Sequence, residues 1–272
     1  MQNEPFVLQN QNNLTIKPFG QLENSPVVGF STRKSGYSLN PYASLNLGLH
    51  VDDECDKVIG NRKKLANDIE FPLDRWVFSE QVHGNKIKKV KEADCGSGTL
   101  HMNDAIKGTD GMYTTEKNIL LASLYADCVP LYFFSPIYST VGLAHAGWKG
   151  TVAKIGPNMI RIWSDNENIP LQSIYVAIGP SISQQNYEVD HYVIDKVNDV
   201  ITSSNDLSYK EIGNNKYLLD LKQLNKQLLI EAGIREDHIF VSNLCTFNES
   251  ELFFSYRRQE RTGRMMSFIG MK

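Results

Sequence analysis

Two apolar runs separated by five residues constrain this chain more than any other feature. VPLYFF (129–134) and TVGLAHA (140–146) are joined by the short segment SPIYS. Strands that are apolar at consecutive positions are typical of sheets covered on both faces, and so short a connection indicates an antiparallel hairpin. The chain is therefore expected to build its core around a buried hairpin.

This hairpin brings a cysteine close to a histidine. If the turn is centred near Ile137, paired residues have numbers that sum to about 274, and Cys128 and His145 sum to 273. The two are then cross-strand neighbours, with Cα atoms about 5.5 Å apart if they are directly opposed. Pro130 lacks an amide hydrogen, so the register is expected to hold to within one residue.

A thiol beside an imidazole has three interpretations. The pair can be a buried cysteine with a hydrogen-bonded histidine, a cysteine nucleophile with a histidine base, or part of a metal site. His83, in SEQVHGN, also ends a predicted strand before a glycine and is the candidate for a third ligand. Two histidines and one cysteine would leave a fourth tetrahedral position open, as in catalytic zinc sites. Spacings of 45 residues (83 to 128) and 17 residues (128 to 145) form no recognised zinc signature, so the residues alone leave the three interpretations open.

The composition is that of a soluble globular protein. Of 272 residues, 41% are apolar and 22% are charged, and the formal net charge is −3. So small a charge gives no electrostatic support for binding nucleic acid or a membrane surface. No apolar run is long enough to span a bilayer, and the first residues lack a signal-peptide pattern, which predicts a cytoplasmic location. The four cysteines contain no CxxC pair, so we expect thiols, ligands or nucleophiles and no disulfides.

The pattern along the chain predicts one domain over residues 14–272, after a flexible N-terminus at 1–13. Strands outnumber helices, and several strands are apolar on both faces, so we expect an α/β (α+β) fold with mixed sheets covered by helices. Helices are predicted at 53–69 and 219–234, and a polar loop at 91–111. Strands are predicted at 27–33, 76–84, 85–90, 118–126, 129–134, 140–146, 173–183, 238–246, 253–258 and 265–270.

An arginine on the first predicted helix lies where apolar residues are expected. Helical spacing places Arg62 on the same stripe as Val58, Leu65 and Ile69. A buried charge is costly unless it is paired, so Arg62 either meets a buried carboxylate or points into a site that receives an anion. Its planar fork suits phosphate, because it can hold two oxygens at once.

Several ordered blocks of sequence resemble the laccase-domain family, also called multicopper polyphenol oxidases. The similarity runs from about residue 29 to residue 269, and the chain departs from it in small ways: Pro157 interrupts the helix expected after AHAGWKG, so that helix should kink or start late. The blocks are STRKSGYSLNPYASLNLGLH, NR (61–62), QVHGNKI, ADCVPLYF, GLAHAGWKGT, IGPSI, YEV and ESELFFSYRRQERTGRMMSFI.

The resemblance implies a single domain of α-β-β-α layers that holds zinc, or copper, through His83, Cys128 and His145. It implies a purine nucleoside phosphorylase that acts on adenosine, inosine, guanosine and methylthioadenosine with phosphate, and that also deaminates adenosine. Oxidase chemistry is not expected, because a laccase needs a blue-copper centre and many clustered histidines, and this chain has six histidines with no HxH pair.

The remaining roles follow from the chemistry that the resemblance implies. Arg62 is predicted to bind phosphate, with Asn46 and Arg33 as its partners, and Asp127 is the candidate general acid or base. A rival hypothesis makes Cys128 the nucleophile and His145 the base of a hydrolase or amidase, for example one that edits peptidoglycan precursors. Near the C-terminus, an ion-pair network is predicted between nearby glutamates and four arginines: Arg257, Arg258, Arg261 and Arg264.

Overall fold

The two apolar runs form the middle of a six-stranded sheet. They are β8 (Val129–Ser135) and β9 (Thr140–Ala146), which pair antiparallel as predicted, and every residue of both strands is buried. The strand order is β14-β10-β8-β9-β6-β5. Its other strands are β5 (Ile87–Lys89), β6 (Gly111–Thr114), β10 (Tyr175–Ile178) and β14 (Ile239–Val241). This is a computed structural model, and it describes residues 4–201 and 208–272.

A second six-stranded sheet covers one face of the first. Its order is β1-β2-β3-β15-β7-β4. Tyr132 and Phe134 of β8 point into the cluster of buried side chains between the two sheets, because side chains alternate along a strand. The strands are β1 (Phe6–Leu8), β2 (Asn13–Ile16), β3 (Val27–Ser31), β4 (Trp76–Phe78), β7 (Ile119–Tyr125) and β15 (Met265–Met271).

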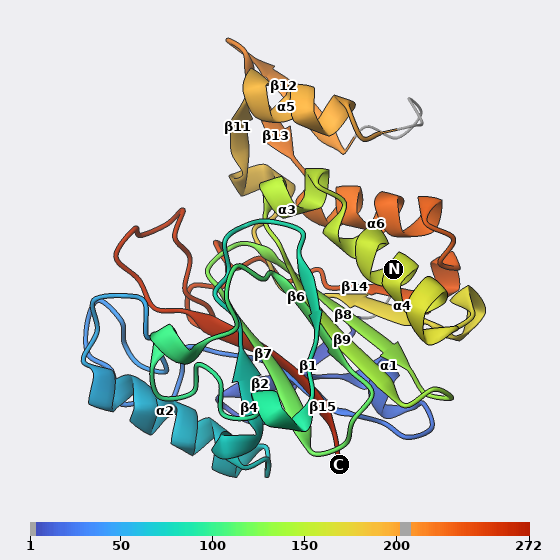
Figure 1. The fold of residues 1–272 in the computed structure, drawn as a ribbon. Coiled ribbons are helices and arrows are strands. Elements are labelled where there is room, and N and C mark those ends of the chain that lie inside the picture. Colours follow the sequence, from blue (N-terminus) through green and yellow to red (C-terminus); the bar gives the residue numbers. More distant parts are fainter. Residues whose placement is uncertain (1–3, 202–207) are drawn as a thin grey trace.

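Helices cover the two outer faces. Leu131 and Phe133 of β8 pack against α4 (Ile155–Glu167) and α6 (Leu221–Glu231), whereas α2 (Cys55–Asp68) packs through Leu65 against the second sheet. The layers therefore run α2, second sheet, first sheet, α4 with α6 (Figure 1). The predicted α/β fold with α-β-β-α layers is confirmed.

The helix after AHAGWKG is divided in two, as Pro157 predicts. α3 (Trp148–Val152) stops before Lys154, which has a left-handed backbone with φ of 59°. Pro157 lies in the first turn of α4, where its missing amide hydrogen costs no helical hydrogen bond. The helix therefore starts late instead of kinking.

The structure differs from the sequence prediction at both ends of the chain. Residues 4–13 were expected to be flexible, but they contain β1 and the turn into β2, because Phe6 is buried against Tyr132. Residues 1–3 lie outside the described part. At the other end, 253–258 is a loop and not a strand, since the N–H of Arg257 donates to a side chain, the Asp127 carboxylate.

Two further features escaped prediction because they are short. Strand β6 lies at the end of the segment predicted as a loop, 91–111. A small sheet, ordered β11-β13-β12, stands with α5 (His191–Asn198) at the top of Figure 1. Its strands are β11 (Glu188–Asp190), β12 (Tyr209–Gly213) and β13 (Lys216–Leu219), and most of their residues are not fully buried, so they carry little apolar signal.

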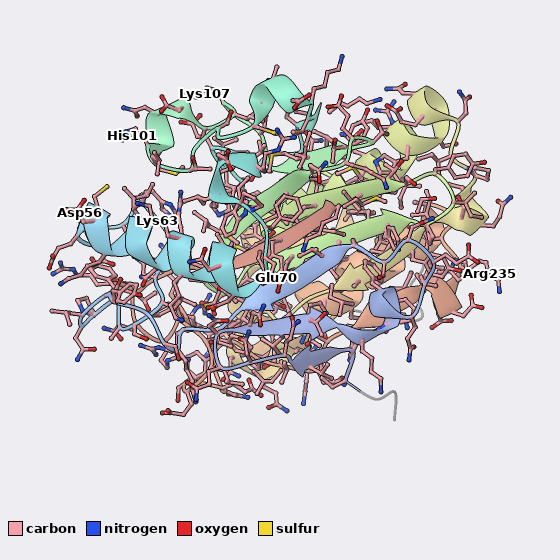
Figure 2. All side chains as sticks on the ribbon, turned by 90° about the horizontal axis from the view of Figure 1, so that it is seen from below. Asp56, Lys63, Glu70, His101, Lys107 and Arg235 are labelled. Carbon is pink, nitrogen blue, oxygen red and sulfur yellow. The ribbon has the colours of Figure 1, made fainter. Side chains whose placement is uncertain are left out.

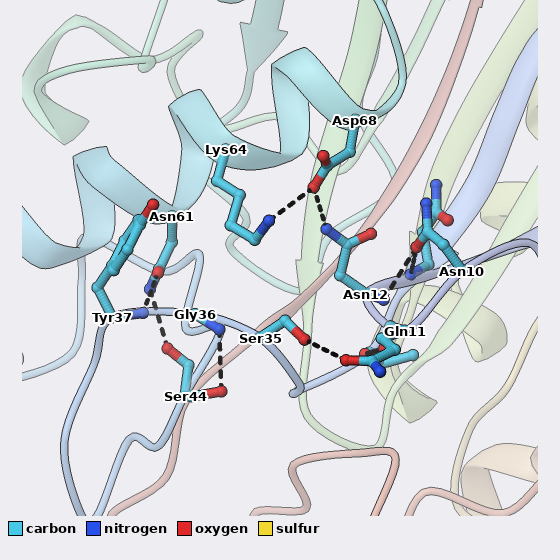
Figure 3. A network of polar contacts seen from close by, with 12 residues as sticks. Asn10, Gln11, Asn12, Ser35, Gly36, Tyr37, Ser44, Asn61, Lys64 and Asp68 are labelled. Carbon is cyan, nitrogen blue, oxygen red and sulfur yellow. Dashed lines mark hydrogen bonds and ion pairs between the residues drawn. The ribbon is translucent and has the colours of Figure 1, made fainter.

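Polar side chains of α2 hold the long loop that follows β3. Asn61 accepts a hydrogen bond from the N–H of Tyr37 and donates to the carbonyl group of Ser44 (Figure 3). It also donates to the carbonyl group of Asn46. At the other end of the helix, Asp68 accepts from Asn12 (Figure 3). A loop rich in turn formers is thereby fixed in one arrangement.

Arg62 is fully buried and ties two loops together. Its Nε and Nη2 donate to the carbonyl of Leu47 at 2.9 and 2.7 Å, and its Nη1 donates to the carbonyls of Gly98 and Thr99 at 2.6 and 2.8 Å. The guanidinium also lies over the ring of Phe78, 4.0 Å from its centroid. Backbone carbonyls and an aromatic face therefore satisfy this charge, in place of the carboxylate or anion that the sequence suggested.

Two simpler expectations concern cysteines and membranes. Cys55, Cys95, Cys128 and Cys245 are all free thiols, as expected. Within residues 4–201 and 208–272, no helix combines the length and apolar character that crossing a bilayer requires.

Replacing Arg62 with Ala should destabilise the fold strongly. The change leaves buried carbonyl groups without donors, so we expect the free energy of unfolding in urea to fall by about 3 kcal/mol or more. Lys63→Ala is the matched control, because Lys63 is the next residue of α2 and is exposed (Figure 2). Equal stability of the two variants would contradict this role.

Candidate metal centre and cavity

Three side chains that are distant in the sequence converge at one end of the buried hairpin. Ligand atoms of His83, Cys128 and His145 all lie within 4.8 Å of one another. The rings of His83 and His145 meet edge to face, with centroids 4.8 Å apart. The structure therefore brings together the three residues that the sequence singled out.

The register of the hairpin agrees with the expected one to within one residue, but it does not place Cys128 directly opposite His145. His145 is opposite Pro130, so paired numbers sum to 275, where about 274 was expected. The turn is centred between Ile137 and Tyr138, which shifts the pairing. Cys128 therefore lies just before β8, diagonal to His145, and the two side chains still meet because diagonal neighbours on a sheet remain within reach.

Gly147 makes room for the cluster. A Cβ atom at this position would lie 3.1 Å from Cys128 Sγ and 3.0 Å from His83 Cδ2. Any larger residue would press on two of the three converging side chains. The glycine that ends AHAG is thus needed for close approach, which explains its place directly after the strand.

A buried carboxylate organises two of the three residues. Asp110 Oδ1 is 3.0 Å from His145 Nδ1 and accepts from the N–H of His83 at 2.9 Å. Asp110 Oδ2 accepts from the N–H groups of Val82 and Gly84 at 3.1 and 2.8 Å. With Nδ1 bonded to Asp110, His145 presents Nε2 to the cluster, as metal-binding histidines commonly do.

The role of Asp110 was not predicted from the sequence. Its position follows from the pairing of two strands: Gly111 of β6 pairs with Ala144 of β9, which places Asp110 opposite His145. Since the segment up to Gly111 was predicted to be a loop, that pairing could not be anticipated.

Cys128 and His145 stabilise each other's charged forms, a thiolate and an imidazolium. Burial raises the pKa of the Cys128 thiol, but the charge of His145 and hydrogen bonds from both histidines outweigh it and lower the pKa below its ordinary value. Burial also raises the pKa of Asp110, yet hydrogen bonds from His145 and Gly84 bring it below its usual range. The cluster therefore favours a thiolate and a carboxylate at neutral pH.

The donor set fits a divalent metal ion. Two imidazoles and a thiolate are the ligands that zinc prefers, Asp110 supplies the outer hydrogen bond, and Gly147 leaves the space clear. His145 is buried, Cys128 is partly buried and His83 is exposed. An ion held by these three residues would thus have one side open to the cavity.

The cluster forms part of the wall of a cavity of about 520 Å³. This is within the usual size range of small-molecule sites, roughly 300–1,000 Å³. One of its lining residues, Lys107, is an exposed side chain that projects from the segment before β6 (Figure 2). The other lining residues are His50, Ser79, Glu80, Gln81, Met102, Asn103, Leu124, Tyr125, Ala126, Tyr256 and Arg264.

His50 is neutral in this setting. Desolvation and the charges of Arg264, Arg62 and His145 lower its pKa to about 4. At neutral pH its ring therefore offers a hydrogen-bond donor and an acceptor without adding charge.

Asp127 is buried beside the cluster but faces the C-terminal loop. It accepts hydrogen bonds from the hydroxyls of Thr246 and Ser255 and from the N–H of Arg257, at 2.7, 3.0 and 2.8 Å. Its carboxylate does not line the cavity. The structure thus gives Asp127 the task of holding the loop that carries Tyr256, and it does not support the predicted acid or base role.

The three residues predicted to bind phosphate also lie outside the cavity lining. The Arg62 fork is occupied by carbonyl groups, and Arg33 donates to the carbonyls of Ala43 and Ser250. Asn46 is buried, where it donates to Asp53 and accepts from the N–H of Arg264. These contacts support the loops around the cavity.

Three charged residues in the cavity lining, Glu80, Lys107 and Arg264, were not predicted as site residues. Glu80 is the one carboxylate in the lining, three residues before His83. Arg264 was expected in an ion-pair network, but the four C-terminal arginines form no ion pair within the described residues. Arg257, Arg258 and Arg264 donate to backbone carbonyls instead.

Comparisons with known proteins agree on one group of relatives. A sequence model of the multi-copper polyphenol oxidoreductase laccase family matches residues 27–272. The chain is 45% identical over 98% of both lengths to purine nucleoside phosphorylase YlmD of Bacillus subtilis, and 46% identical over 90% of both to that of Geobacillus stearothermophilus. The crystal structure of YlmD from the latter superposes with a TM-score of 0.96 at 43% identity, covering 99% of this chain and 100% of that one.

Asp110→Asn should weaken metal binding without unfolding the protein. Each carboxylate oxygen accepts two hydrogens, so an amide leaves two donors facing its NH₂ group in either orientation. We expect the Kd for Zn²⁺, measured by competition with a chelating dye, to rise about 10- to 100-fold. Asp104→Asn, exposed on the same segment, is the control, and an unchanged Kd for the Asp110 variant would refute the role of this carboxylate.

Proposed function

The chain belongs to the multi-copper polyphenol oxidoreductase laccase family, and on this basis we propose that it is a purine nucleoside phosphorylase. The observation that carries the proposal is similarity over nearly the whole chain, at 45 and 46% identity, to relatives with that name. It is combined with a cavity of nucleoside size that His83, Cys128 and His145 help to line. Its proposed substrates are adenosine, inosine, guanosine and methylthioadenosine, together with inorganic phosphate. The predicted cytoplasmic location remains a prediction.

The proposed reaction exchanges one bond at the sugar. An oxygen of phosphate forms a bond to C1′ of the ribose while the bond from C1′ to the purine nitrogen breaks. The electron pair of that bond stays with the purine, which takes up a proton as it leaves. The site must therefore hold phosphate and nucleoside together and supply a proton to the leaving base.

The lining residues divide into groups suited to these tasks. Met102, Leu124 and the exposed ring of Tyr256 offer apolar surface for a purine. Glu80 is the residue we assign to proton transfer, because its carboxylate lines the cavity; it lies 3.6 Å from the exposed Lys107. We assign the acid and base role to Glu80 in place of Asp127.

Zinc is the proposed ion at the cluster. When bound it would supply Lewis acidity to an oxygen or nitrogen of the substrate or to water. Copper can also be held by two histidines and a thiolate, but oxidase chemistry would need further histidine clusters, and the described residues contain one cluster of this kind.

Adenosine deamination is proposed as a second reaction of the same cavity. Water adds to C6 of the purine, ammonia leaves, and adenosine becomes inosine. The favourable observation is that a His-Cys-His cluster and the carboxylate of Glu80 line the same cavity, since zinc deaminases combine similar ligands with an acidic proton carrier.

The first test is phosphorolysis by purified, zinc-loaded protein. We expect inosine and phosphate to give hypoxanthine and ribose 1-phosphate, with about one zinc per chain, and we expect activity and metal to be lost together in Cys128→Ala and after chelation. The rival Cys128 nucleophile predicts something different: a covalent substrate adduct on Cys128 in metal-free protein, detectable by intact-mass spectrometry. That adduct, with undiminished turnover after chelation, would overturn the zinc proposal.

Glu80→Gln tests the proton-transfer role. We expect kcat for deamination and phosphorolysis to fall about 100-fold or more, because general acid–base catalysis typically contributes that much. The zinc content should not change, since Glu80 is not one of the three converging residues. Glu70→Gln, an exposed site just after the C-terminal end of α2 (Figure 2), is the control for loss of one negative charge. Full activity in the Glu80 variant would remove it from the mechanism.

A further inference from the structure

Arg264 is a cation in the cavity wall without a carboxylate partner. Its Nη1 donates to the carbonyls of Thr262 and Gly263 at 2.8 and 3.1 Å. Within residues 4–201 and 208–272, its Nε and Nη2 make no hydrogen bond and no acidic group forms an ion pair with it. Two donor nitrogens of the guanidinium therefore have no partner within these residues, and Arg264 is one of the residues that line the cavity.

The surrounding loop fixes this side chain in place. A Cβ atom at Gly48 would lie 2.8 Å from Arg264 Cγ and 3.3 Å from His50 Cε1, so the glycine lets both side chains pass close to the backbone. Asn46 accepts from the N–H groups of Arg264 and Gly48, at 2.9 and 3.0 Å. The N–H of Leu47 donates to the carbonyl of Arg264 at 3.1 Å. Arg264 and His50 are thus held side by side.

The other cation of the cavity is differently placed. Lys107 is 59% exposed in its side chain and lies 3.6 Å from the Glu80 carboxylate, so its charge is both hydrated and partly balanced. Arg264 is only partly exposed, and burial lowers its pKa. A partly desolvated charge without a counter-ion is costly, and an anionic ligand would remove that cost.

We propose that Arg264, with His50 beside it, forms the phosphate-binding subsite of the cavity. The assignment rests on the proposed phosphorylase function and names the residue that holds its co-substrate. A guanidinium with two free donors matches the spacing of two phosphate oxygens. The position is the same cavity as the His83–Cys128–His145 cluster, so phosphate and nucleoside would share one enclosed space. Arg62 and Asn46 do not contact phosphate in this proposal; they fix the loop against which Arg264 packs.

Steady-state kinetics of Arg264→Gln test the assignment. In zinc-loaded protein, we expect the KM for inorganic phosphate to rise about 10- to 100-fold, since hydrogen bonds to charged groups contribute that much. The KM for inosine should change by less than about twofold and the zinc content should not change. Arg264→Lys keeps the charge but loses the fork, so its KM for phosphate should be intermediate. Arg261→Gln is the matched control, because Arg261 is exposed and lies outside the cavity lining.

Direct binding separates failure of this subsite from failure of the proposed function. Calorimetry with inorganic phosphate on zinc-loaded protein needs no turnover. If the unmodified protein cleaves inosine but Arg264→Gln and Arg264→Lys keep its KM for phosphate, the subsite is wrong and the function stands. If it binds phosphate through Arg264 without cleaving nucleosides, the function is wrong and the subsite stands. Loss of affinity for adenosine monophosphate alone, with inorganic phosphate unaffected, would assign Arg264 to a nucleotide and overturn the proposal.

Discussion

The buried carboxylate of Asp110 is the contact on which the arrangement of the site depends. It lies where the start of β6, the end of β9 and the loop after β4 meet, and it accepts four hydrogen bonds from those segments. His83 sits in that loop with a φ of 61°, a left-handed backbone that costs energy for a non-glycine residue. Because one carboxylate restrains both this strained segment and the His145 ring, two ligands from distant parts of the sequence are positioned together.

The layers of the fold place this carboxylate at one end of the strands β6 and β9. The hairpin of β8 and β9 is buried on both faces, so its ends are the first points at which polar groups can reach solvent. Cys128 and His145 lie at that end. The second sheet and the loops around α2 then close a cavity over them, and Arg62 fixes those loops through backbone carbonyls. Arg62, a buried charge that looks functional in the sequence, therefore has a structural role in holding the loops around the site.

Much of this could be predicted from the sequence, and the exceptions have physical causes. The hairpin, α2 and α6 carry strong periodicity, and the convergence of Cys128 with His145 followed from the short turn even though the two residues are diagonal and not directly opposite. Asp110 and Arg264 could not be found in that way. Asp110 depends on the pairing of a four-residue strand, and Arg264 depends on which of several arginines the C-terminal loop brings to the cavity. Strand pairing and loop conformation are properties of tertiary structure and leave no local pattern.

The central claim is that His83, Cys128 and His145 hold one divalent ion that remains open to the cavity. Anomalous diffraction at the zinc absorption edge, from crystals of protein purified without added chelator, tests it most directly. The account predicts a single strong peak at about 2.0–2.3 Å from one atom of each of the three side chains, with a fourth position facing Glu80 and Arg264. A peak elsewhere, or an imidazole of His83 turned away from it, would contradict the account.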